Sequence, residues 1–216
     1  MSGALAGVLV EVQRRIEALY ALERGAPVTD FLIPQQDACV LPGSGSRTLV
    51  TQEGDEVSLG VVLEEQVGRH LERCDPRVRL DQDNLGPFCT AAEEVSHFVY
   101  LLFCASASRS VTQLELELQG EVDKYLSAVF LLSLQNDGAV SSRLRMLLFR
   151  NYRLTEDLPE ESASRYRTAN QLADRYCGFL EARFLRPARL RELARESRRF
   201  YRLGQRQKLE RIAELS

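Results

Sequence analysis

The spacing of apolar residues changes several times along the first third of the chain. Over residues 5–20 they recur every three or four positions, with charged residues mostly opposite, which predicts an amphipathic helix. Residues 28–33, 47–51 and 56–63 are typical of strands, and apolar residues take every second position in the last of these. A short polar link joins the last two strands and indicates a hairpin. We expect three antiparallel strands here, followed by a short helix over residues 64–73.

From about residue 80 onward, apolar positions follow helical spacing almost throughout. Asp83 or Asn84 can cap a first long helix that ends near residue 107, and Thr112 with Glu115 forms a capping-box pattern that opens a second helix. Further helices are expected over about 141–152, from Pro159 to about 180, and after Pro187, with a kink or break at Gly204.

Together these elements predict an α+β protein in two parts. Residues 1–78 form a small α/β subdomain, in which flanking helices accompany the N-terminal three-stranded antiparallel sheet. Residues 79–216 form a mostly α-helical bundle, which ends in basic helices over residues 188–216.

Composition narrows the functional classes. No stretch approaches the roughly 18 to 20 consecutive apolar residues that span a bilayer, so we expect no membrane partner. The N-terminus lacks the basic region of a signal peptide. The five cysteines form an odd set without a C-x-x-C pair, which is typical of reduced thiols and predicts a cytoplasmic protein.

Glu94 and His97 form the one pattern that suggests a metal ligand set. A Glu and a His three positions apart share a helix face, as in di-iron carboxylate bundles. Such a site needs a second Glu-x-x-His pair, and the other histidine, His70, lies five residues from Glu65 rather than three. The pattern therefore favours a polar edge on a buried helix, and a metal site stays an alternative.

Other catalytic signatures are missing from the sequence. It contains no nucleotide-binding glycine motif, no G-x-S-x-G and no neighbourhood typical of a cysteine protease. A pair of His97 with Cys89 or Cys177 remains open, because such partners meet in space rather than in sequence. We expect buried, unreactive cysteines, no cofactor, and a function that is not enzymatic.

The charge is distributed unevenly along the chain. The net charge is −3, and 26 of the 28 basic residues are arginines. Residues 181–216 carry eleven basic and five acidic residues, a balance of +6 against −9 for the rest. Five arginines recur there every three or four positions and form what we call the arginine stripe: Arg191, Arg195, Arg198, Arg202 and Arg206.

The arginine stripe leaves three functional hypotheses. Guanidinium groups bind carboxylates and phosphates through paired hydrogen bonds. The leading hypothesis is a non-enzymatic interaction protein (an adaptor, chaperone-like protein or regulatory subunit) with a protein partner or a second copy of itself. A metal-dependent or cysteine enzyme centred on Glu94 and His97 is the second. Nucleic-acid binding is the third, and the acidic remainder of the chain argues against it.

Overall fold

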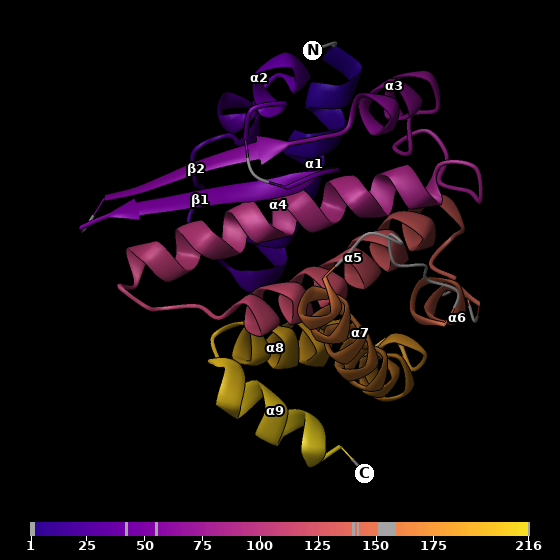
Figure 1. The fold of residues 1–216 in the computed structure, drawn as a ribbon. Coiled ribbons are helices and arrows are strands. Elements are labelled where there is room, and N and C mark those ends of the chain that lie inside the picture. The colour runs from indigo at the N-terminus through magenta and orange to yellow at the C-terminus, as the bar shows by residue number, and fades with distance from the viewer. Residues whose placement is uncertain are drawn as a thin grey trace. The chain divides into compact units, whose positions relative to one another are not determined.

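The protein is an α+β protein, 66% helical, with a two-stranded antiparallel sheet. The computed structural model describes residues 3–41, 43–54, 56–139, 141, 143–150 and 159–215. Chain contacts divide it into two compact units (Figure 1). The first comprises Met1–Ala18 and Leu22–Arg109, and the second comprises Leu19–Ala21 and Ser110–Ser216. The domain boundary at residue 78 that the sequence suggests stays a prediction. Independent folding of either part stays a prediction.

The first unit contains the predicted amphipathic helix, the hairpin and the first long helix. Antiparallel pairing of β1 with β2 places Arg47 opposite Val62 at one end and Glu53 opposite Glu56 at the other. The unit's helices and strands are α1 (Gly3–Tyr20, whose last turn belongs to the second unit), η1 (Val28–Phe31), α2 (Gln35–Ala38), β1 (Arg47–Glu53), β2 (Glu56–Val62), α3 (Glu65–Arg73) and α4 (Leu85–Ser106).

The prediction of a strand over residues 28–33 is wrong. Residues Val28–Phe31 form one turn of 3₁₀ helix, closed by a hydrogen bond of 3.0 Å from Asp30 N to Pro27 O. Only the following residues meet the sheet, through an isolated bridge from Leu32 and a 2.8 Å bond from Ile33 N to Val61 O. Prolines at both ends of the segment lack an N–H and shorten the length over which it can pair.

The second unit is helical in all its described residues, apart from the turns that join its helices. α5 packs along α7, and α7 also contacts α6 and α9. The elements are α5 (Gln113–Gln135), α6 (Leu144–Phe149), α7 (Glu160–Leu180), the π-helical turn η2 (Glu181–Leu185), α8 (Leu190–Tyr201) and α9 (Gln205–Ala213). α8 begins three residues after Pro187, where the helix was expected, because Ala188 has a left-handed backbone (φ 55°) that interrupts helical geometry.

The predicted capping box at α5 is formed in part and serves a second helix as well. The Thr112 hydroxyl accepts a hydrogen bond of 3.2 Å from Glu115 N, which confirms the N-cap. The Glu115 carboxylate instead accepts a bond of 3.0 Å from Gln205 N, at the N-terminus of α9. A buried carboxylate at this position complements the positive end of the α9 dipole and ties α9 to α5.

A buried polar cluster connects α9 with the middle of α5. Lys208 is fully buried, and its Nζ donates a hydrogen bond of 2.6 Å to Gln119 Oε1 and lies 4.9 Å from the Phe200 ring centroid. Gln119 Nε2 in turn donates to Asp123, which also accepts a hydrogen bond from Tyr20. A buried ammonium is stable only with such partners, so this cluster fixes α9 in place.

Candidate binding site

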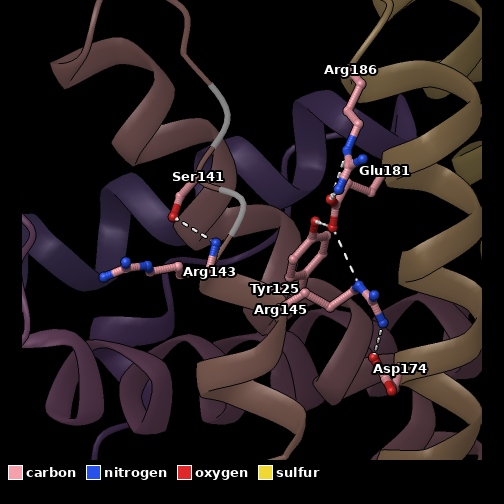
Figure 2. Close-up of polar contacts among 7 residues, drawn as sticks. All are labelled: Tyr125, Ser141, Arg143, Arg145, Asp174, Glu181 and Arg186. Atoms are coloured by element: carbon pink, nitrogen blue, oxygen red, sulfur yellow. Dashed lines mark hydrogen bonds and ion pairs between the residues drawn. The ribbon is translucent and has the colours of Figure 1, made fainter.

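The junction between α7 and α8 is organised by a buried carboxylate. The Glu181 side chain is 4% exposed and begins the π-helical turn, which closes with a 2.9 Å bond from Arg186 N to Glu181 O. Figure 2 shows Arg145 and Arg186 approaching its carboxylate from opposite sides. Arg186 donates to Oε1 through Nε (3.0 Å) and Nη2 (2.5 Å), and Arg145 Nε donates to Oε2 at 3.3 Å.

Two further side chains complete this junction, which we call the Glu181 junction. Tyr125 of α5 donates a hydrogen bond of 3.2 Å to Glu181 Oε2, and Arg145 of α6 also pairs with Asp174 of α7. Burial, together with the nearby Cys177 and Glu181, raises the pKa of Tyr125 above its ordinary value, so the phenol stays protonated and can donate. Three helices and the turn that leads into α8 are thereby held at one point.

Beyond the Glu181 junction, one face of α8 borders a shallow hollow of about 490 Å³ that is open to solvent, which we call the α8 groove. It is lined by apolar side chains and by arginines of the stripe, and Leu190 at its start is 58% exposed. Among the residues that the structure describes, Arg191 and Arg195 are exposed and have no hydrogen-bond or ion-pair partner. The lining residues are Leu190, Arg191, Ala194, Arg195 and Arg198.

The remaining members of the arginine stripe have intramolecular contacts. Arg198 Nε donates to Leu19 O (2.8 Å) and Arg202 Nη2 donates to Tyr20 O (3.0 Å), at the C-terminal end of α1. Cations at a helix C-terminus satisfy its last carbonyls and complement its dipole. Arg206 lies beyond the break at Gly204, on α9, and faces Glu210 at 3.8 Å. The stripe is therefore divided between two helices.

Glu94 and His97 lie on α4 in the first unit, and both are buried. Glu94 Oε2 accepts a hydrogen bond of 2.8 Å from the Thr48 hydroxyl, and Thr48 also bonds the Glu94 carbonyl at 3.2 Å. The distance from His97 Nδ1 to Glu94 Oε2 is 3.8 Å, beyond hydrogen-bond range. The carboxylate thus ties α4 to β1, and its metal-binding role stays a hypothesis.

The cysteines occupy two kinds of environment. Cys89, Cys104 and Cys177 are buried, as expected, whereas Cys39 and Cys74 are exposed. Burial, with Glu121 and Asp174 nearby, raises the pKa of Cys177 well above its ordinary value. A thiol that holds its proton at neutral pH is a poor nucleophile, so this environment does not favour Cys177 as a catalytic residue.

Sequence reasoning missed the Glu181 junction. Its members are far apart in the chain: Arg145 precedes Glu181 by 36 residues and Tyr125 precedes it by 56. Tyr125 lies in an apolar run, and Glu181 is one of many charged residues in a helical segment. No local spacing marks such a cluster, since only the packing of α5, α6 and α7 brings its members together.

Among the described residues, α4 is long and apolar enough by length and composition to cross a membrane, and 72% of its most apolar window is buried, as is common for core helices. No protein-family model, no curated protein and no solved structure matches the chain.

Proposed function

We propose that this chain is a non-enzymatic interaction protein that binds an acidic segment of a protein partner in the α8 groove. The observation that carries the proposal is the pair of exposed arginines, Arg191 and Arg195, which have no polar partner among the described residues. They stand one helical turn apart, the spacing at which two side chains of a helix reach the same ligand.

The groove combines charge with an apolar contact, which favours a protein over a bare anion. Leu190 directly precedes Arg191 and Ala194 directly precedes Arg195, and Leu190 is a large exposed apolar residue. Binding surfaces in proteins commonly place apolar contact beside arginine. An acidic peptide with interspersed leucines matches both features, so we take it as the occupant. The reduced cysteines support a cytoplasmic location as part of the same proposal.

The test uses a labelled synthetic peptide of alternating glutamate and leucine pairs, with fluorescence anisotropy as the readout. We expect binding that weakens as salt rises, and a loss of at least roughly tenfold in affinity for R191E/R195E. The matched control is R183E/R206E. It makes the same change in net charge at two exposed arginines outside the groove, and it should change affinity by less than roughly twofold.

Several outcomes contradict the proposal. The first is the absence of binding to the acidic peptide, and the second is an equal loss in the control variant. A duplex DNA of the same charge that binds more tightly than the peptide would instead favour the nucleic-acid alternative, since phosphate contacts dominate such binding.

A further inference from the structure

The α8 groove is lined by residues of a single helix. Its lining forms two neighbouring rows along α8 (Leu190–Tyr201), and the members of each row are four positions apart. The first row is Leu190, Ala194 and Arg198, and the second is Arg191 and Arg195. Residues four positions apart on a helix are neighbours, separated by about 6 Å along the axis. A ligand that contacts the whole lining must therefore present two matching rows of its own.

A gap in this surface lies at Ala194, the smallest residue of the lining. Ala194 is half-buried, and the three arginines around it are exposed. On a helix, residues at positions i, i+3, i+4 and i+7 enclose such a gap, and in paired helices a side chain of the facing helix enters it. Here the four positions are Arg191, Ala194, Arg195 and Arg198, and we call the space between them the Ala194 gap. It has the arrangement that receives one side chain of a second helix.

The other face of α8 holds the helix in the second unit. Leu193, Ser197 and Phe200 are buried on that face. Arg198, beside the Ala194 gap, donates a hydrogen bond of 2.8 Å from Nε to Leu19 O. Because these contacts fix α8, the two rows and the gap are formed before a ligand binds, and binding need not order them.

A helical ligand matches this surface and an extended one does not. In a helix, residues at i and i+4 form one row and residues at i+3 and i+7 form the next, so acidic and apolar side chains lie side by side on one face. In a strand, successive side chains point to opposite faces, so one face offers a single row. The middle of α8 also gives a strand no backbone partner, because its N–H and C=O groups bond within the helix.

We infer, on the basis of the proposed function, that the acidic segment that binds the α8 groove is an amphipathic α-helix packed along α8. A leucine side chain of that helix enters the Ala194 gap, and its glutamates pair with Arg191 and Arg195. The glutamates are four positions apart because the two arginines are. The pattern expected in the partner is therefore glutamate at i and i+4 with leucine at i+3 and i+7.

The first test compares labelled peptides of identical composition, about sixteen residues or four helical turns long. In one, pairs of glutamate and pairs of leucine alternate, which gives a helical period; in the other, single glutamates and leucines alternate, which gives the period of a strand. Fluorescence anisotropy with the full chain should show at least roughly tenfold tighter binding of the first peptide. A proline in the middle of the first peptide, on its face away from the leucines, should weaken binding at least roughly tenfold, whereas alanine at the same position should change it less than roughly twofold.

The second test fills the Ala194 gap without changing any charge. Ala194→Phe occupies the space that the leucine of the ligand enters, and it should weaken binding of the paired glutamate–leucine peptide at least roughly fivefold. Ala213→Phe is the matched control, because Ala213 is an exposed alanine on α9, outside the α8 groove. It should change the affinity less than roughly twofold. Circular dichroism of both variants checks that they are folded before the affinities are compared.

The outcomes separate the helical ligand from the proposed function. If neither peptide binds, acidic-segment binding itself is refuted, and the helical ligand with it. If the two peptides bind equally, if the strand-period peptide binds more tightly, or if the proline is tolerated, the ligand is not a helix, although acidic-segment binding at the α8 groove stands. Equal effects of Ala194→Phe and Ala213→Phe would show that no side chain enters the Ala194 gap, which also overturns the inference.

Discussion

The buried carboxylate of Glu181 leads to a sharp stability prediction. Glu181→Gln keeps the size of the side chain and one carbonyl acceptor, but it removes the charge that faces Arg145 and Arg186. It also puts an amide N–H₂ group where a carboxylate oxygen accepts a bond from a guanidinium. The amide N–H₂ group and the guanidinium, both hydrogen-bond donors, then face each other at a position largely inaccessible to water.

The size of the effect follows from the exposure of each partner. A hydrogen bond to a charged group contributes about 1 kcal/mol more than a neutral one, and Arg145 loses the larger share of this amount because its side chain is only 30% exposed. Arg186 is 63% exposed and regains hydration, so its loss is about half as large. With the cost of the mismatched donor, we expect Glu181→Gln to lower the free energy of unfolding by about 2 kcal/mol.

Urea denaturation followed by far-ultraviolet circular dichroism measures this change, and thermal denaturation should show a fall in Tm of roughly 4 to 8 °C. The control is Glu210→Gln, since Glu210 forms an exposed pair with Arg206 at 3.8 Å, and the expected loss is below about 0.5 kcal/mol. Equal effects of the two substitutions would refute the claim that the Glu181 junction stabilises the second unit.

Two predictions concern groups whose environment the fold determines. Burial, with neighbouring acidic groups, raises the pKa of Tyr20, Tyr125 and Tyr176 above 10. The folded state therefore favours the protonated phenols. Their contribution to the free energy of unfolding is complete below pH 10 and is lost as the pH rises toward the pKa values that these phenols have in the folded protein. The ultraviolet absorbance of tyrosinate should therefore show that at least these three of the seven tyrosines ionise only together with unfolding, and early titration of all seven would contradict this. A thiol reagent should label Cys39 and Cys74 rapidly and the other three cysteines only in denaturant, and rapid labelling of all five would show that the core is open.

Local signals in the sequence predicted most elements correctly. The amphipathic spacing of residues 5–20 matches α1, the alternation of residues 56–63 matches β2, and the Thr112 signal matches the start of α5. These patterns depend on neighbours within one or two turns, so a single sequence is enough to recognise them. The segment 28–33 shows the limit: its apolar residues suit a strand, but its flanking prolines leave it only one bridge to β2.

Side-chain roles depended on the packing of distant segments. Glu115 follows the capping-box spacing, yet its carboxylate caps α9 rather than its own helix. Lys208 belongs by sequence to a basic tail, and the fold buries it completely beside Gln119. In the arginine stripe, Arg191 and Arg195 are exposed at the α8 groove, whereas Arg202 and Arg198, the latter also at the groove, donate to carbonyls at the end of α1.

The sequence by itself therefore determined most of the secondary structure, the α+β class and the separation of charge along the chain, because these follow from local spacing and composition. Only the tertiary structure decided which charges are partnered. Whether an arginine donates to a carboxylate, to a carbonyl or to water depends on residues many positions away in the sequence. Because an unpaired buried charge is costly, a buried guanidinium requires a specific partner. For this protein, the choice separates the Glu181 junction, which stabilises the fold, from the α8 groove, whose arginines remain exposed.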